Sequence, residues 1–537
     1  MNPDKKFISG IFHSRNLLGL AFLFATTRLT NLTLLPVFND EAVYLNWARM
    51  ISNGEANPFL SILADNKKPL QIWLIALNMV FLDDPLEAGR FASIEAGAVT
   101  MAGIYFSASL LFSPTAGLLS SLAYILCPYT LLFDRQAQES SLLSACMAWS
   151  IWLSISFAQA QRVTIKHASA LFLTIGLGLL SLSTALLFIF FPALIKLLYF
   201  KRKNCPSWNF LIICYGTGLF IAALPYLVLS LTMEDFQLKN LIIPNTHRLG
   251  QSSFANLFVN IPSALQSGFN GVADYFWKYL TPPICFLAGL GMLTKPDKIY
   301  KLHWILPVYF FIPILVLLGT AGAGFSRYYV FCTVPLFISS GGFLVYFTRR
   351  IQSQFSSINP LLLVVLLITG FFFLPCKFIL DIIFQPANVA YVERDKYQFV
   401  SSQFSGYGVP EAVNFLKGKA RNKKITVLTT SNWGSPADAI YIYLSNHPNI
   451  DLFSSYWVFS KPLMPPNLKS IDIHQRFTGT FLKRLIPKDL PETYFIRRTS
   501  LGFDRELFIR ANPNFRPLKF FAKPGGNFFV EIYKLKK

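Results

Sequence analysis

Charged residues are scarce in this sequence, and acidic ones scarcest. Only 14% of the 537 residues are charged and 53% are hydrophobic, whereas about 25% charge is usual for a soluble domain. This composition excludes a disordered chain and an ordinary soluble enzyme. Lysine and arginine outnumber aspartate and glutamate by 48 to 27, giving a net charge of +21. The basic residues form short clusters between apolar runs, as the positive-inside rule produces, so the charge indicates membrane orientation and no nucleic-acid partner.

Paired cysteines are also missing. The seven cysteines lie within or beside apolar runs, without a Cys-x-x-Cys pair or a zinc-like spacing to histidine. We therefore expect neither a disulfide framework nor a structural metal. Near the N-terminus, Lys5, Lys6 and Arg15 precede an apolar stretch from Leu17, and no small-residue cleavage site follows before Arg28. This stretch is interpreted as an uncleaved first membrane span.

Long apolar runs fill most of residues 1–384. A bilayer about 30 Å thick needs roughly 17–25 helical residues for each span. Eleven runs suit this purpose: 16–37, 87–112, 115–133, 141–158, 168–183, 184–200, 209–231, 277–294, 303–319, 328–347 and 358–380. The sequence therefore predicts a polytopic α-helical membrane protein with about eleven transmembrane helices.

A shorter apolar segment, 69–82, decides the orientation. If it lies on the membrane surface as an interfacial helix, five basic clusters fall on one side, with 14 basic residues against two acidic ones. The rest of the membrane region holds 11 basic and 14 acidic residues. The clusters are Lys5/Lys6/Arg15, Arg162/Lys166, Lys196/Lys201/Arg202/Lys203, Lys295/Lys298/Lys301 and Arg349/Arg350. This asymmetry places the N-terminus in the cytoplasm and the C-terminus outside a cell (inner) membrane.

With that orientation, the long outer loops are 38–86 and 232–276, and residues 385–537 form an extracytoplasmic domain. Short alternating patterns in this tail predict a mixed α/β fold. The expected elements are a helix at 410–417, a strand at 424–430, a turn and helix at 434–444, strands at 451–458 and 494–498, and a closing hairpin around 523–527. The expected domains are therefore a transmembrane part, 1–384, and this tail.

Polar residues gather on the predicted outer side. Asp40 and Glu41 open a segment of helical periodicity. Asn39 or Asp40 would serve as an ordinary N-cap, and a first-turn glutamate suits the helix dipole. The functional alternative makes Asp40 and Glu41 a general base or a metal ligand at the membrane surface.

Three further groups of cations have two interpretations each. Lys67 and Lys68, just before Trp73, are either lysines reaching the interface beside an aromatic anchor or a phosphate site. The short loop with Arg135 and Glu139 either forms a local surface ion pair with Asp134 or binds substrate.

Arg327 and Tyr328 stand where an apolar run resumes, so Arg327 either reaches the outer interface or binds an anion. His247 and Arg248 form a weaker polar group in the loop 232–276. Arg28 and Glu95 lie within spans, where a pair between two helices would be a purely structural explanation.

In order and position, these pieces resemble the GT-C superfamily of membrane glycosyltransferases, in particular bacterial relatives of dolichyl-phosphate-mannose protein mannosyltransferases and aminoarabinose lipid A transferases. The motifs that carry the resemblance are Asp40-Glu41, Lys68-Pro69 with Trp73, Arg90, Arg135 with Glu139, Arg327-Tyr328 with Pro335, and the tail segments Asp395-Lys396-Tyr397-Gln398-Phe399 and Ser405-Gly406-Tyr407-Gly408. The resemblance covers nearly the whole chain. It implies a GT-C-like fold and transfer of a sugar from a polyprenyl-phosphate donor to an acceptor outside the membrane.

The resemblance also implies roles for residues. Asp40 would take the proton of the acceptor hydroxyl, with Glu41 supporting it or a metal. Lys68, Arg135 and Arg327 would neutralise the leaving phosphate, and Glu139 would position the sugar or the acceptor. Tyr328, His247 and Arg248 complete the expected substrate-binding set.

Two departures from the family pattern concern the donor. Residues 181–184 read Ser-Leu-Ser-Thr where many relatives have Thr-Lys-Gly-Pro, and Leu70 replaces the second proline of the usual Lys-Pro-Pro. The first loop has no Asp-x-Asp, and a divalent metal is left open.

The sequence thus predicts a hexosyl- or pentosyltransferase whose partners are a polyprenyl-phosphate sugar, membrane lipids and a glycolipid, glycan or protein acceptor. The alternative is a transporter or lipid flippase of glycolipid-like substrates. That class needs a polar path near the bilayer midplane, and in this sequence only Arg28 and Glu95 are candidates for one. A receptor built around the outer domain would leave the embedded charges unexplained.

Overall fold

A computed structural model of the chain describes residues 3–159, 163–198, 206–233, 261–294, 302, 304–321, 324–354, 360–429, 434–454, 492–499, 505–511 and 513–536. They form two compact units. Unit 1 comprises Met1–Leu32, Asp65–Gln71 and Arg90–Val392, and unit 2 comprises Thr33–Ala64, Ile72–Gly89 and Glu393–Lys537.

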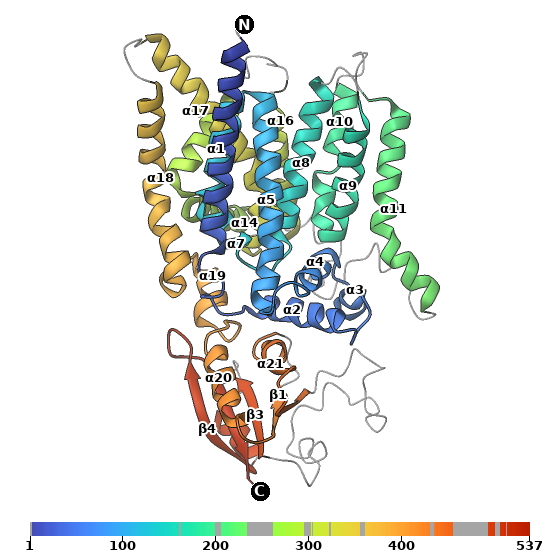
Figure 1. Cartoon of the computed structure of the whole chain (residues 1–537), viewed down its shortest axis with the longest axis vertical. Coiled ribbons are helices and arrows are strands. Elements are labelled where there is room, and N and C mark those ends of the chain that lie inside the picture. The colour runs from blue at the N-terminus through green and yellow to red at the C-terminus, as the bar shows by residue number, and fades with distance from the viewer. Residues whose placement is uncertain are drawn as a thin grey trace. The chain divides into compact units, whose positions relative to one another are not determined.

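Unit 1 is a bundle of helices, several of which run side by side (Figure 1). Its α-helices are α1 (Pro3–Leu29), α5 (Pro85–Leu111, whose first turn counts with unit 2), α6 (Pro114–Ile125), α7 (Pro128–Asp134), α8 (Ser140–Gln159), α9 (Ile165–Ser181), α10 (Phe191–Leu198), α11 (Trp208–Thr232), α14 (Ile261–Tyr275), α15 (Thr281–Leu293), α16 (Ile305–Ala321), α17 (Val334–Gln354) and α18 (Pro360–Phe384). Shorter helical turns are η1 (Ser183–Leu187), η2 (Phe276–Leu280) and η4 (Ser326–Thr333). Each of the eleven predicted apolar runs overlaps a helix.

Length and hydropathy identify four stretches in the described part of the chain that are able to cross a membrane: Pro85–Leu111, Ser140–Gln159, Trp208–Thr232 and Ser326–Ile351. The pair α6 and α7, bent by 66°, makes a fifth if it counts as one span. The bend has a local cause, because the residue before a proline is sterically disfavoured from the α-helical φ and ψ angles. Cys127, directly before Pro128, is extended with φ −82° and ψ 123°.

Close helix packing in unit 1 depends on glycines. A Cβ at Gly291 of α15 would lie 2.3 Å from the Ser339 carbonyl oxygen of α17, and a Cβ at Gly341 of α17 would lie 2.2 Å from the Ser120 Oγ of α6. These contacts are closer than any side chain permits, so α17 packs against both neighbours through backbone. A Cβ at Gly289, also in α15, would have no neighbour within 4 Å among the described residues.

Unit 2 combines the first predicted outer loop with the C-terminal region. The loop contributes α2 (Asn39–Ser52) and most of α3 (Leu60–Asp65) and α4 (Leu70–Asn78). The C-terminal elements are η5 (Pro386–Asn388, which still counts with unit 1), α19 (Glu393–Lys396), η6 (Tyr397–Ser401), α20 (Val409–Ala420), β1 (Ile425–Thr429), α21 (Ala437–Leu444), β2 (Ile450–Ser454), β3 (Glu492–Arg498), α23 (Arg505–Ala511), β4 (Phe515–Ala522) and β5 (Phe529–Leu535).

The C-terminal strands form one mixed sheet in the order β2-β1-β3-β5-β4. β1 is parallel to β2 and β3, while β5 is antiparallel to β3 and β4. α20 lies across this sheet (Figure 1). The aromatic core includes Phe495, Phe508 and Tyr533. The predicted mixed α/β fold of the tail is confirmed, including the hairpin, whose turn has Gly525 and Gly526 at φ +95° and +74°. The predicted strand end at 455–458 lies outside the described residues.

Candidate active site

Asp40 and Glu41 lie in the first turn of α2, in unit 2. The helix begins at Asn39 and Phe38 is its N-cap residue, so neither Asn39 nor Asp40 occupies the capping position considered above. Glu41 is fully buried, and its Oε2 accepts the Phe38 backbone N–H at 2.9 Å. Glu41 therefore holds the start of the helix. Asp40 is only partly buried, and its Oδ1 accepts a hydrogen bond from Asn39 Nδ2 at 3.3 Å.

Lys68 lies in unit 1, in the segment between α3 and α4. Its Nζ donates to the Tyr226 hydroxyl at 2.9 Å and lies 4.9 Å from the centre of the Tyr226 ring. Tyr226 follows Pro225, a proline inside α11. Burial lowers the pKa of Lys68, because the charged ammonium has lost part of its hydration. An anion at this position would restore the lost solvation.

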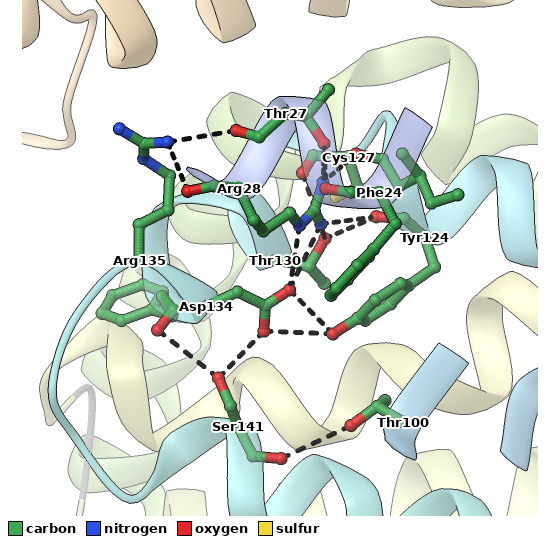
Figure 2. Close-up of polar contacts among 12 residues, drawn as sticks. Phe24, Thr27, Arg28, Thr100, Tyr124, Cys127, Thr130, Asp134, Arg135 and Ser141 are labelled. Carbon is green, nitrogen blue, oxygen red and sulfur yellow. Dashed lines mark hydrogen bonds and ion pairs between the residues drawn. The ribbon is translucent and has the colours of Figure 1, made fainter. Parts of the chain in front are cut away.

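A fully buried ion pair joins α1 to α7 in unit 1. Arg28 Nε and Nη2 donate to Asp134 Oδ2 at 3.3 and 3.2 Å, as Figure 2 shows. The Tyr124 hydroxyl and Ser141 Oγ donate to the same carboxylate at 2.8 and 2.9 Å. The carboxylate is thus satisfied from three elements. The expectation of a local surface pair within the loop is wrong for Asp134, because its carboxylate is buried and pairs with Arg28 of α1, 106 residues away in the sequence.

Arg135 follows Asp134, and its side chain turns toward the C-terminal end of α1 (Figure 2). Nη1 donates to the carbonyl oxygens of Thr27, Arg28 and Thr30 at 3.1, 2.7 and 2.8 Å, and Nη2 donates to that of Asn31 at 2.8 Å. The last carbonyls of a helix lack intrahelical partners and carry partial negative charge. Arg135 therefore caps α1. Arg90, also buried, donates to the Leu32 carbonyl at 2.7 Å, just beyond that end.

The loop after Arg135 contains buried amide groups that sequence reasoning missed. Gln136 and Gln138 lie in this loop and Gln71 lies in α4, and all three are at most 2% exposed. Among the described residues, no partner is found for either amide atom of Gln136 and Gln138 or for Gln71 Oε1. Gln71 Nε2 donates to Ser93 Oγ at 3.1 Å, and Ser93 Oγ donates to the Gln138 carbonyl at 3.2 Å. Ser93 thus joins the segment of Lys68 to the loop of Arg135.

An unsatisfied buried amide costs about 1–3 kcal/mol, and in native proteins such groups are explained by local strain, a catalytic role or an ordered water or ion. Neutral glutamines carry no charge or metal-like spacing, which is why the sequence did not identify them. Their buried positions became visible only with the fold.

The remaining candidates lie in unit 1 or outside the described residues. The Arg327 guanidinium lies 4.6 Å from the Phe325 ring and 5.4 Å from the Tyr328 ring, so the two aromatics hold the cation at the start of η4. Glu139 immediately precedes α8 and is partly buried. His247 and Arg248 lie outside the described residues.

The structure therefore joins the loop of Arg135 and Glu139 to the segment of Lys68, while Asp40 and Glu41 belong to the other unit. Within the described ranges, no group of three or more His, Cys, Asp or Glu side chains is arranged to hold a metal ion.

Residues 66–228 match the family described as dolichyl-phosphate-mannose-protein mannosyltransferase. This segment contains Lys68, Arg90, Arg135 and Glu139. Among curated proteins, no relative matches the sequence.

Solved structures share the fold at low identity. ArnT from Cupriavidus metallidurans in the apo state has a TM-score of 0.57 and 11% identity, with 98% of each chain covered. The same enzyme bound to undecaprenyl phosphate has a TM-score of 0.55 and 10% identity, with 97% of each chain covered. The archaeal oligosaccharyltransferase AglB from Archaeoglobus fulgidus, in complex with an inhibitory peptide and a dolichol-phosphate, has a TM-score of 0.48 and 12% identity over 81% of this chain. This chain spans 64% of AglB.

The chain is a membrane protein whose helical bundle and C-terminal α/β unit have the ArnT fold. The family match and this fold confirm the resemblance to the GT-C superfamily of membrane glycosyltransferases.

Proposed function

We propose that this protein transfers a sugar from a polyprenyl-phosphate-linked donor to an acceptor outside the membrane, which is lipid A, an envelope glycan or a protein. The observation that carries the proposal is the family match over residues 66–228, because it contains Lys68, Arg135 and Glu139. The fold shared with ArnT supports it, since one ArnT structure holds undecaprenyl phosphate.

The proposed reaction forms one bond and breaks one. The oxygen of an acceptor hydroxyl attacks the anomeric carbon of the sugar, and the bond from that carbon to the donor phosphate breaks. Asp40 accepts the hydroxyl proton as general base. Polyprenyl phosphate leaves with the bonding electron pair, so its oxygens gain negative charge as the transition state forms.

Lys68 and Arg327 are assigned to that developing charge. Lys68 is partly desolvated and paired with a neutral tyrosine, so a phosphate oxygen is a better partner for it than any group it now contacts. Arg327 lies over two aromatic rings, which restrict the directions in which its guanidinium donates. Preorganised cations of this kind stabilise the transition state more than the ground state.

Arg135 keeps a proposed role on the same phosphate, together with its observed contacts to the end of α1. Glu139 is assigned to positioning the sugar or the acceptor. The buried amides of Gln71, Gln136 and Gln138 are assigned to the sugar hydroxyls, since an amide supplies both a donor and an acceptor. Tyr328, His247 and Arg248 complete the proposed binding set, with Glu41 supporting the first turn of α2 beside the base.

The proposed placement has about eleven spans in a cell (inner) membrane, with the N-terminus in the cytoplasm and the α/β unit outside. The basic clusters of the sequence support this orientation. The sugar, hexose or pentose, is left open, as is a divalent metal.

Release of polyprenyl phosphate from a panel of lipid-linked sugars, measured with purified protein in the presence of candidate acceptors, tests the proposal. The Asp40→Asn variant keeps the shape of the side chain but removes the base, so we expect its kcat to fall at least 100-fold with unchanged folding. Full activity of Asp40→Asn would remove Asp40 from the mechanism. A folded wild-type protein that releases no product from any donor and acceptor would favour the transporter alternative.

A further inference from the structure

Three C-terminal segments contact the start of α2, and all of them belong to unit 2, as α2 does. The Asn39 backbone N–H donates to the Phe404 carbonyl at 3.2 Å. A Cβ at Gly406 would lie 2.1 Å from the Val37 carbonyl oxygen, so only glycine permits this approach. The Phe38 ring meets the Phe399 ring edge-on at 4.9 Å. The backbone leading into α2 is therefore held by residues 399–406.

The second segment approaches the Asn39 side chain. Gly434 has φ +86°, and a Cβ there would lie 2.3 Å from Asn39 Cγ, so both the backbone conformation and the close approach require glycine. Asp438 accepts the Gly434 N–H at 2.5 Å through Oδ2 and the Asn46 amide at 2.7 Å through Oδ1. Asp438 thus ties the glycine turn to the middle of α2.

The third segment is the end of β3. Arg498 Nη1 donates to Asn39 Oδ1 at 2.8 Å and to the Ser435 carbonyl at 2.8 Å. Its guanidinium lies 5.2 Å from the Phe404 ring. Burial lowers the pKa of Arg498 to about 10, which still leaves it charged at neutral pH.

The orientation of the Asn39 amide follows from its neighbours. Oδ1 accepts from two donors, Arg498 Nη1 and the Ser435 N–H at 3.2 Å. Nδ2 donates to Asp40 Oδ1 at 3.3 Å. A flipped amide would place NH2 against two donors and oxygen against a carboxylate, so only one orientation is compatible with the network.

We infer that Asn39 and Arg498 are positioning residues. They hold the Asp40 carboxylate in place through two consecutive hydrogen bonds, from Arg498 to Asn39 and from Asn39 to Asp40. The inference rests on the proposed function, in which Asp40 is the general base. Arg498 fixes the amide oxygen of Asn39, and the amide nitrogen on its other side fixes one carboxylate oxygen. A misplacement of about 1 Å at a reacting group costs roughly 100-fold in rate, so loss of these hydrogen bonds lowers turnover without removing the base.

Asn39→Asp is the sharpest test, because it keeps the size of the side chain and the acceptor for Arg498 but replaces the donor to Asp40 with a second carboxylate. We expect kcat for donor cleavage to fall 10- to 100-fold with an unchanged donor KM. The acidic limb of the kcat/KM profile should move to higher pH, because a like charge now opposes ionisation of the base. A purely structural role would reduce the amount of active protein and leave the position of that limb unchanged.

Arg498→Lys changes the other end of this series of hydrogen bonds and leaves the sequence of α2 unchanged. It therefore tests the positioning role if the Asn39→Asp variant does not fold. A lysine keeps the charge, but its flexible stem and tetrahedral ammonium lack the rigid guanidinium plane that aims Nη1 at both Asn39 and Ser435. We expect a fall in kcat again without a change in KM. Arg510→Ala is the control, since Arg510 is 78% exposed in the same unit and pairs only at the surface with Glu506.

Wild-type kcat and an unshifted acidic limb in the folded variants would overturn the inference. Asp40→Asn separates the two levels of the argument. If Asp40→Asn is inactive and the positioning variants are normal, the positioning role fails and the base role stands. If Asp40→Asn is fully active, the base role fails by itself.

Discussion

Arg28 and Asp134 are both buried, with exposed side-chain fractions of 0% and 2%, and they meet between α1 and α7. Removing one partner of a buried ion pair leaves an uncompensated charge and destabilises by about 3–5 kcal/mol, whereas replacing both with apolar groups is often neutral. We expect Arg28→Ala to lower the melting temperature of the full-length protein in detergent markedly. The double variant Arg28→Met/Asp134→Leu should recover most of the loss.

The exposed pair Arg510 and Glu506 provides the comparison, because surface pairs contribute about 0–1 kcal/mol. The melting temperature of Arg510→Ala should lie within about a degree or two of that of the parent protein. A melting temperature for Arg28→Ala equal to that of Arg510→Ala would contradict the structural role of the buried pair.

At this scale, the sequence predicted some contacts and could not predict others. Glu41 was expected either to interact favourably with the dipole of α2 from its first turn or to act in chemistry. Its bond to the Phe38 N–H is a local capping contact that three-residue spacing allows. The partners of Arg28 and Asn39 lie 106 and 459 residues away, so no local spacing encodes them. Arg135 looked like a loop cation, and only the fold shows the carbonyls it caps.

At the scale of elements, α15 carries its own test of helix packing. Gly291 and Gly289 lie in the same helix, but only Gly291 has a neighbour so close that a Cβ would overlap it. Gly291→Ala must push α15 away from α17, and we expect a loss of about 1–3 kcal/mol. Gly289→Ala should be neutral or stabilising by up to about 1 kcal/mol, because alanine favours helix over glycine.

Thermal unfolding of the two variants in the same detergent compares them directly. If both lowered the melting temperature equally, helix propensity or insertion would explain the loss, and the close approach of α15 and α17 would not.

Element types were more predictable than their limits. The strand expected at 424–430 is β1, Ile425–Thr429, and the helix expected at 410–417 extends to Ala420 as α20. Apolar periodicity reveals a helix or a strand, but its ends depend on the neighbours it meets. The expected interfacial segment 69–82 is helical only over Leu70–Asn78, and its first residues group with unit 1 while the rest group with unit 2.

At the scale of the whole molecule, the proposed orientation makes a direct prediction for labelling. Lys417 and Arg350 are both exposed, but the basic-cluster argument places them on opposite sides of the membrane. In intact spheroplasts, a membrane-impermeant maleimide should label Lys417→Cys strongly and Arg350→Cys only at the level of the parent protein. After lysis, both should label. Labelling of Arg350→Cys alone before lysis would reverse the orientation.

The two units also show what the linear order of domains hides. The sequence predicted a boundary at residue 385, and the C-terminal part of unit 2 begins at Glu393. Residues 33–64 and most of 72–89 belong to the same unit, although they lie far away in the chain. Composition detects a change from apolar to polar segments, but it does not indicate which separate polar segments pack together.

The 459 residues between Asn39 and Arg498 also set an order in time. At about 5–20 residues per second, the ribosome needs roughly 20 to 90 s to make that stretch. For most of this interval α2 has been synthesised but the turn at Gly434 has not, and the end of β3, which also holds the first residues of α2, is made only when the interval closes. A segment made late in synthesis therefore completes the surroundings of a carboxylate made early, so a nascent chain, or one terminated before Arg498, carries Asp40 without the support that positions it.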